Sequence, residues 1–207
     1  MKRTMLFSLT ILLLSGLSIL PCPLFAQDIY LPAPEKTGGM PLMEAINLRQ
    51  STREFSSKEL SQQTLSNLLW TAYGFNREDK RVVPSANNKQ SFEVYVALEN
   101  GIYLYDAKAN QLILKVNGDH RAATGKQDYA ATAPVNLLYV ADYEKQPDRT
   151  TSHIDCGFLS QNVYLFCASE GLATVVRGWI DKEAIRNLLG LSEKHEVILA
   201  QTVGYRK

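Results

Sequence analysis

Two stretches of the chain place hydrophobic residues at the spacing of a helix. Within residues 62–73 they recur at i, i+3, i+4, i+7 and i+8, which puts them on one face that can be buried. That face carries Leu65, Leu68, Leu69, Ala72 and Tyr73. Ser61 is predicted to cap this helix and Gly74 to end it. Asp181 is predicted to cap another helix that ends before Gly190. Its expected inward residues are Ala184, Ile185, Leu188 and Leu189.

A short helix is predicted over residues 42–48 and a longer one between Asp155 and Gly171. Asp155 is interpreted as the N-cap of the long helix and Gly171 as its stop. One face is expected to carry Phe158, Leu159, Asn162, Val163 and Phe166. Cys156 and Cys167 also fall in this segment, at a separation of roughly 16 Å along a helix axis. That distance is too long for a disulfide within one chain, so both cysteines are expected to be buried as small apolar residues.

The remaining hydrophobic segments have the length and composition of strands. Residues 101–106 and 111–116 are predicted to form a hairpin around the turn AKAN. Residues 134–141 are apolar with little alternation, which predicts a central strand buried on both faces. Further strands are predicted at 92–98 and 197–203, and residues 118–131 are expected to be helical or irregular. The mixture lacks a regular alternation of strand, helix and strand, which favours an α+β fold.

Residues 1–26 are interpreted as a secretory signal peptide. Lys2 and Arg3 precede an apolar run over residues 6–20, and Ala26 is a suitable cleavage position. An uncleaved anchor is the competing interpretation, but the run is short for a span of roughly 20 residues. Lipoprotein processing at Cys22 is disfavoured because a proline precedes it. The protein is therefore expected to be exported, as a periplasmic protein without a stable membrane anchor.

The exported chain is expected to consist of an extended arm over residues 27–42 and one domain over residues 43–207. The whole chain has a formal net charge of +1, and loss of the two basic residues of the signal peptide leaves it near neutral. A near-neutral chain argues against general binding of nucleic acid, which needs a basic face.

The three histidines lie far apart without metal-ligand spacing, and no nucleotide-binding glycine motif or nucleophile elbow is found.

The sequence RQSTREF carries the first candidate binding residues. Arg49, Ser51 and Arg53 offer two fixed cations and a hydroxyl, followed by the apolar Phe55. Arginine can hold a phosphate through parallel charge-assisted hydrogen bonds, and serine can add another. The segment is therefore a candidate phosphate-binding site; a solvated basic loop is the alternative.

Two further segments could contact a flat polar ligand. In PSANNKQSF, Pro84 stiffens a loop in which Ser85 and Asn88 offer donors and acceptors for a heterocycle. In GLATVVRGWID, an apolar strand ends at Arg177 and Gly178, where bare backbone could approach such a ligand closely. The alternatives are a polar turn before a strand and an ordinary turn between a strand and a helix.

Taken together and in this order, these segments resemble the nitroreductase family of FMN-dependent oxidoreductases. RQSTREF is similar to the family pattern R-x-S-x-R-x-F, and PSANNKQSF to its loop P-S-x-x-N-x-Q. The run over residues 171–205 is similar to the family's C-terminal pattern, with its LGL and VGY sequences. The resemblance covers roughly residues 43–205 and is nearest to the compact branch that includes thiazoline- and oxazoline-forming dehydrogenases.

The resemblance implies an α+β sandwich of helices around a mainly antiparallel sheet, assembled as an intertwined homodimer with FMN at the subunit interface. It implies that Arg49 and Ser51 hold the phosphate and that Arg53 reaches toward the ribityl chain or the pyrimidine side of the ring. Pro84, Ser85 and Asn88 would lie along the flavin, and the amide near Gly178 would face N5 and O4. Arg206 would assist at the phosphate.

The family resemblance also implies the chemistry. NAD(P)H would pass a hydride to flavin N5, and a small nitro- or quinone-like acceptor would take the electrons, with no dedicated catalytic side chain. Arg177 stands where many members have an apolar or acidic residue, so the substrate stays open. Two alternatives are a flavin-dependent dehydrogenase of a peptide-derived or other small substrate, and a non-catalytic binding module that has lost FMN.

Overall fold

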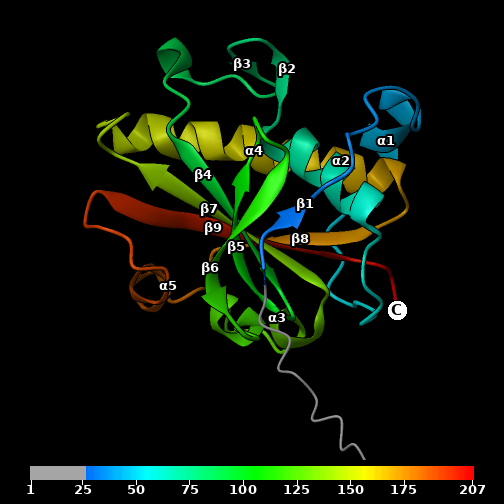
Figure 1. Ribbon diagram of the computed structural model, residues 1–207. Coiled ribbons are helices and arrows are strands. Elements are labelled where there is room, and N and C mark those ends of the chain that lie inside the picture. The colour runs from blue at the N-terminus through cyan, green and yellow to red at the C-terminus, as the bar shows by residue number, and fades with distance from the viewer. Residues whose placement is uncertain (1–26) are drawn as a thin grey trace, which may run out of the picture.

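The computed structural model describes residues 27–207, and its centre is a seven-stranded antiparallel sheet (Figure 1). The strand order is β1-β6-β5-β4-β7-β9-β8, so β8 forms one edge. The strands are β1 (Ile29–Tyr30), β4 (Phe92–Leu98), β5 (Gly101–Asp106), β6 (Gln111–Asn117), β7 (Val135–Asp142), β8 (Ala173–Arg177) and β9 (His195–Gly204). A separate ribbon, which the hydrophobic pattern did not predict, pairs β2 (Phe75–Arg77) with β3 (Lys80–Arg81).

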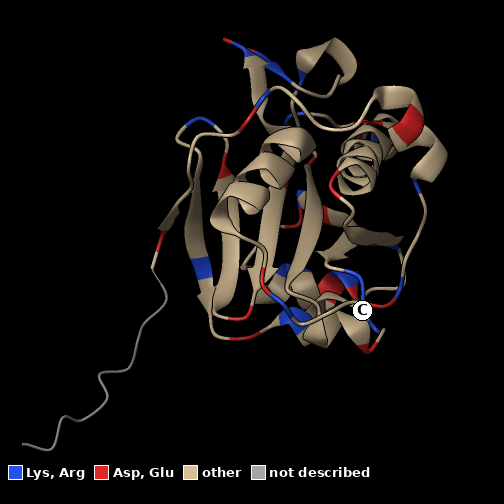
Figure 2. Ribbon diagram, turned by 90° about the vertical axis from the view of Figure 1, so that its right-hand side faces the viewer, with Lys and Arg blue, Asp and Glu red and all other residues tan. Residues whose placement is uncertain are grey.

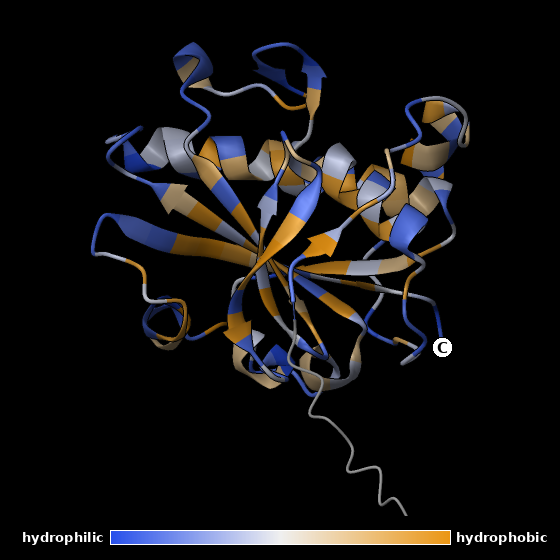
Figure 3. Ribbon diagram, viewed as in Figure 1, coloured by the Kyte–Doolittle hydropathy of each residue, from blue (hydrophilic) through white to orange (hydrophobic). Residues whose placement is uncertain are grey.

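Strand β7 lies in the interior of the sheet, between β4 and β9. Every residue from Val135 to Asp142 is buried, which confirms the prediction of a central strand covered on both faces. The hydrophobic colouring in Figure 3 is concentrated on these central strands. The predicted hairpin is also confirmed, since β5 pairs with β6 from Gly101 opposite Asn117 to Asp106 opposite Gln111.

Helices cover both faces of the sheet (Figure 1). One face carries α1 (Leu42–Leu48), α2 (Gln62–Tyr73) and α4 (Arg149–Ser169); the other carries α3 (Tyr129–Thr132), α5 (Lys182–Leu188) and the 3₁₀ turn η2 (Arg121–Thr124). The larger core lies under α2 and α4, and a smaller core around Ile185 lies under α5. This arrangement confirms the predicted α+β sandwich.

Most predicted helix ends are confirmed. The Ser61 side chain accepts from the Thr64 N–H at 3.0 Å, and the Asp181 side chain accepts from the Ala184 N–H at 3.0 Å. Gly171 and Gly190 follow α4 and α5 with φ of +67° and +64°, a left-handed conformation that glycine adopts without strain.

Three predictions about helices were wrong in detail. The long helix starts at Arg149, because Asp148 is its N-cap and accepts from the N–H groups of Thr150 and Thr151. Asp155 lies inside the helix and is buried. Phe158, expected on the inward face, is 40% exposed, and Ala184 in α5 is exposed as well. In both cases the side chain lies beside the buried stripe of its helix. Successive residues are 100° apart around the axis, so the spacing alone does not fix the edge of the buried face.

The arm that precedes α1 crosses the outer strands and α2. Strand β1 pairs with β6, and Leu31 is buried. The Asn110 side chain donates to the Pro32 carbonyl at 2.7 Å, which ties the arm to the turn between β5 and β6. The predicted signal peptide lies outside the described residues. Among residues 27–207, no helix combines the length and apolar character that crossing a membrane requires.

Candidate functional site

The segment RQSTREF lies along the exposed edge of β8. The Thr52 N–H donates to the Thr174 carbonyl at 2.9 Å, which fixes the segment beside the strand. Tyr164 of α4 completes the junction, because its hydroxyl accepts from the Val176 N–H at 3.0 Å and lies 2.9 Å from the Ser51 hydroxyl. One tyrosine hydroxyl therefore connects the predicted phosphate-binding segment with the edge strand.

The basic residues of this region come from both ends of the chain. Arg49 lies with its guanidinium carbon 5.2 Å from the centre of the Tyr164 ring. Arg206 joins the same segment, because it forms an antiparallel bridge with Phe55. With its amide oxygen turned toward Arg206, the Gln50 side chain lies 3.2 Å from both terminal guanidinium nitrogens. Figure 2 shows the basic positions along the chain that descends from α1 to the C-terminus.

The charges of Arg49, Arg53 and Arg206 are not compensated within the described chain. None of the three forms an ion pair with a carboxylate of residues 27–207. Guanidinium groups that form no ion pair among the described residues, together with the Ser51 hydroxyl, form a donor set suited to an anion such as a phosphate.

The turn at Gly178 lies at the far end of the same edge strand. Gly178 lies four positions after Thr174, which corresponds to roughly 13 Å along a strand. The N–H groups of Gly178 and Trp179 make no turn or loop hydrogen bond among the described residues. A Cβ placed on Gly178 would meet only Leu199 Cδ2, at 3.7 Å. An elongated ligand could therefore run along β8 from the basic residues to this turn.

The side chain of Arg177 points away from that edge and into the protein. Its guanidinium donates to the Thr124 carbonyl at 2.8 Å, to Asn136 Oδ1 at 2.9 Å and to Gln127 Oε1 at 3.3 Å. Only 3% of the residue is exposed. Burial lowers the pKa of Arg177 to about 10, so it stays protonated at neutral pH.

The loop PSANNKQSF lies over the N-terminal half of α4, beside the β2–β3 ribbon (Figure 1). Asn87, Asn88 and Gln90 have φ of 51°, 54° and 47°, a conformation that costs energy outside glycine. The loop holds this shape through its own side chains: the Gln90 N–H donates to Ser85 Oγ at 3.0 Å, and Gln90 Nε2 donates to Asn88 Oδ1 at 3.0 Å. Pro84 is exposed.

Asp155 ties this loop to α4. Its carboxylate accepts from the Ala86 N–H at 3.3 Å and has no cation partner among the described residues. Burial raises the pKa of Asp155, and the Ala86 hydrogen bond opposes that rise. Sequence reasoning missed this role because aspartate before an apolar run is also typical of a helix cap.

Within the chain, the two groups of predicted site residues lie far apart. Asp155 and Tyr164 are nine residues apart on α4, which corresponds to roughly 13 Å along the axis and about two and a half turns. The loop at Asp155 and the basic segment at Tyr164 therefore contact opposite sides of the helix. The structure brings Arg49, Ser51, Arg206 and Gly178 to one edge of the sheet, while Pro84, Ser85 and Asn88 lie elsewhere.

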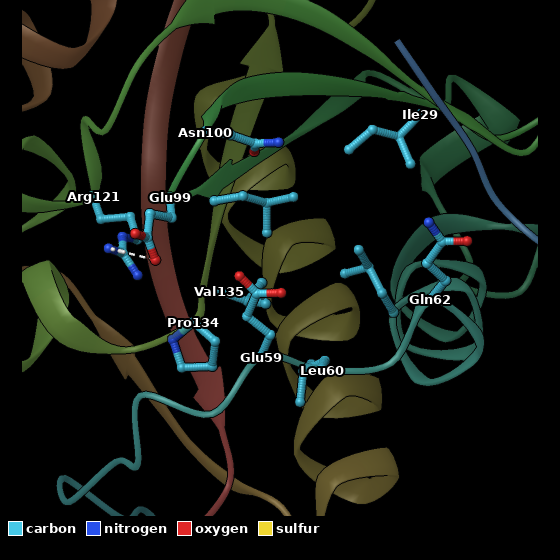
Figure 4. A pocket seen from close by; sticks show the side chains of 11 residues that line it. Ile29, Glu59, Leu60, Gln62, Glu99, Asn100, Arg121, Pro134 and Val135 are labelled. Carbon is cyan, nitrogen blue, oxygen red and sulfur yellow. Dashed lines mark ion pairs between the residues drawn. The ribbon is translucent and has the colours of Figure 1, made fainter. Parts of the chain in front are cut away.

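A cavity of about 420 Å³ lies outside both groups. Figure 4 shows it between the arm, the start of α2 and the end of β4, with the Arg121–Glu99 ion pair at one side. None of the predicted site residues lines it. It therefore does not account for the cluster of arginines at β8.

The comparisons with known proteins agree with the geometry. The model of the nitroreductase family matches residues 46–205. The chain belongs to the nitroreductase family. A relative from Methanocaldococcus jannaschii, "Putative nitroreductase MJ1384", is 32% identical over an alignment of 184 residues, which covers 81% of this chain and 91% of that protein.

Solved structures of the nitroreductase family share the fold. The crystal structure of a "putative nitroreductase" from Ralstonia eutropha JMP134 is 40% identical, with a TM-score of 0.83 over 90% of this chain and 92% of that one. A second structure, from Desulfovibrio desulfuricans, was solved in complex with FMN. It is 20% identical, with a TM-score of 0.61, and covers 82% of this chain and 88% of that one, which supports the fold alone.

Proposed function

We propose that this nitroreductase-family protein is an FMN-dependent oxidoreductase that acts as a homodimer. The observation that carries the proposal is the row of uncompensated arginines beside β8, which leads to a turn with free backbone N–H groups. A ligand with a phosphate at one end and a flat polar ring at the other matches this order of contacts.

The phosphate would be held at the basic end of the row. Arg49 and Arg206 supply guanidinium groups that no carboxylate of the described chain neutralises, and Ser51 supplies a hydroxyl whose position is set by Tyr164. Charge-assisted hydrogen bonds of this kind contribute roughly 1.5–3 kcal/mol each. The donor set therefore suits the phosphate of FMN.

The ring would lie at the Gly178 end. The N–H groups of Gly178 and Trp179 would face N5 and O4 of the isoalloxazine, and the exposed Arg53 would reach the ribityl chain or the N1–O2 edge. When bound, FMN supplies the hydride-accepting N5 atom. The protein's part is to orient the ring and to stabilise negative charge on it through these donors.

The remaining contacts would come from a second copy of the chain. Pro84, Ser85 and Asn88 lie on the opposite side of α4 from the basic segment, so one protomer cannot bring both groups to one ligand. Helices α1 and α4 also expose apolar side chains, which a partner would cover; they are Leu42, Met43, Ile46, Leu48, Ile154 and Phe158. Figure 3 shows hydrophobic positions on α1.

The electron donor would be NAD(P)H and the acceptor a small nitro- or quinone-like molecule. If residues 1–26 direct export to the periplasm, as their sequence predicts, the donor available there decides the physiological reaction. The proposal is tested by the absorbance spectrum of the purified protein before and after anaerobic addition of NADH or NADPH. Flavin bands that bleach are expected.

The same experiment separates the alternatives. Flavin bands that stay unbleached with either nucleotide would favour a dehydrogenase of a small organic substrate. A colourless protein that also fails to take up added FMN would contradict the proposal and favour a binding module.

Replacement of Arg49 tests the phosphate contact. Arg49→Ala is expected to weaken FMN binding about 10- to 100-fold, because one charge-assisted contact is lost. Fluorescence titration of the apoprotein with FMN measures this affinity. Arg186→Ala is the matched control, because Arg186 lies on α5 across the sheet. Equal affinities of the two variants for FMN would show that Arg49 does not contact the phosphate.

A further inference from the structure

Arg177 carries a buried positive charge whose partners are all neutral. The guanidinium contacts the carbonyl and hydroxyl of Thr124 and the side-chain amide oxygens of Gln127 and Asn136. No carboxylate of residues 27–207 lies within 4.0 Å of it. Its Nε atom is buried and has no hydrogen-bond partner. Buried charges in proteins are normally paired, so this arrangement requires an explanation beyond fold stability.

The neighbouring residues hold the guanidinium in one place. A Cβ on Gly125 would lie 1.6 Å from Arg177 Nη1, so the glycine leaves the space that the guanidinium occupies. Asn136 Oδ1 also accepts from the Thr202 hydroxyl at 2.7 Å, which fixes the acceptor on β7. The charge is thus built rigidly into the last residue of β8, directly before Gly178.

This position joins the buried charge to the turn proposed to face the flavin ring. The Lys126 N–H donates to the Trp179 carbonyl at 3.4 Å, so the loop that holds Arg177 also contacts the turn after Gly178. A neutral residue could satisfy part of this hydrogen-bond set. What only a cation adds is a positive potential at the Gly178 turn, from a charge that is itself buried directly before the turn.

We propose that Arg177 is an electrostatic positioning residue that favours the reduced state of FMN bound at the Gly178 turn, acting through its uncompensated charge and without touching the ring. The inference rests on the proposed function. A hydride brings two electrons and one proton, so its transfer from NAD(P)H to the flavin leaves one additional negative charge on the ring until a second proton is taken up. Two opposite unit charges about 10 Å apart, at an effective dielectric constant of about 20, attract each other by an energy equivalent to roughly one order of magnitude in an equilibrium constant.

The experiment measures the ratio of reduced to oxidised FMN on the protein at a fixed potential. Dithionite is the reductant, and reference dyes report the potential. Arg177→Gln removes the charge and keeps some hydrogen bonds. We expect it to lower the ratio at least tenfold, which corresponds to about 30 mV for a two-electron couple. Arg177→Lys keeps the charge and loses the fork geometry, and it is expected to stay within threefold of the unmodified protein even if its melting temperature falls.

A second variant tests the charge while leaving Arg177 in place. Gln127 Oε1 lies 3.3 Å from Arg177 Nη1, so Gln127→Glu would place a carboxylate beside the guanidinium. It is expected to lower the ratio in the same direction as Arg177→Gln, with an unchanged or higher melting temperature. Lys126→Gln is the control, because Lys126 is an exposed cation of the same loop, paired with Asp181 at 3.6 Å. This control is expected to stay within threefold.

The outcomes separate this inference from the proposed function. If FMN binds but Gln127→Glu and a folded Arg177→Gln both leave the ratio of reduced to oxidised FMN unchanged, the proposed role of Arg177 is contradicted. The proposed FMN-dependent function is not affected by that result. If Arg177→Lys lowers the ratio as much as Arg177→Gln does, the effect comes from the hydrogen-bond geometry of the guanidinium and not from its charge. That result would also contradict the proposed role of Arg177. If the unmodified protein takes up no FMN, both proposals fall.

Discussion

Tyr164 is the residue on which the geometry of the basic segment depends. Its hydroxyl contacts both Ser51 and the Val176 N–H, so it connects α4, β8 and the segment that follows α1. The hydrophobic pattern did not single it out, because a tyrosine on a helix carries no indication of which distant backbone group its hydroxyl will meet.

Removal of that hydroxyl is expected to be measurable at the residue scale. Tyr164→Phe keeps the ring under Arg49 and should lower the free energy of unfolding by about 1 kcal/mol, because two hydrogen bonds are lost at a partly exposed site. Urea unfolding measures the change, and FMN titration should show weaker binding. Tyr30→Phe is the control, since Tyr30 is 76% exposed. Equal stability of the two variants would argue against the role of the hydroxyl.

Asp155 gives a pH-dependent prediction. Its pKa is raised in the folded protein, so its contribution to stability is fully present below the pKa of the unfolded chain and is lost as the pH rises through the folded value. Asp155→Asn keeps an acceptor for the Ala86 N–H and removes the buried charge. It should therefore gain stability relative to the unmodified protein as the pH rises from about 4 to 7. Thermal melts across this range measure the difference, and a constant difference would contradict the assignment.

At the scale of elements, the sequence predicted what depends on local periodicity and caps. Strands β4 to β9 follow from short apolar runs, α2 follows from the helical spacing of its apolar side chains, and the stop of α4 follows from Gly171. The start of α4 was misplaced because Asp148 and Asp155 both have cap chemistry, and only tertiary packing decides between them. The direction of the Arg177 side chain was equally unpredictable, since its partners come from β7, η2 and the loop before α3.

The exposed apolar faces of α1 and α4 give an element-scale prediction. Ile46 and Phe158 are 47% and 40% exposed, and burying a charge in their place would oppose association. Ile46→Asp and Phe158→Asp are each expected to shift the protein toward monomer, as measured by analytical ultracentrifugation. Ala184→Asp on α5 is the control, because Ala184 is exposed on the opposite face. A monomeric unmodified protein would contradict this prediction.

At the scale of the whole molecule, the α+β sandwich separates the two groups of predicted site residues. The sequence resemblance predicts which residues belong to the site, but no local pattern could show that α4 stands between the two groups. The basic segment at β8 and the loop at Asp155 can serve one ligand only if two protomers contribute, one group each. We therefore expect each FMN site to be shared between two protomers.

Complementation between two defective variants tests that claim most directly. One variant carries Arg49→Ala with Arg206→Ala, and the other carries Ser85→Ala with Asn88→Ala. Each alone is expected to bind little FMN. In a mixed dimer, one of the two sites would combine an intact basic segment with an intact loop, while the other would lack both.

The measurement is the amount of FMN bound per dimer after the two variants are co-expressed with different tags and the mixed dimer is isolated. We expect close to one tightly bound FMN per mixed dimer and almost none in either parent. A mixed dimer that binds no more FMN than its parents would contradict it.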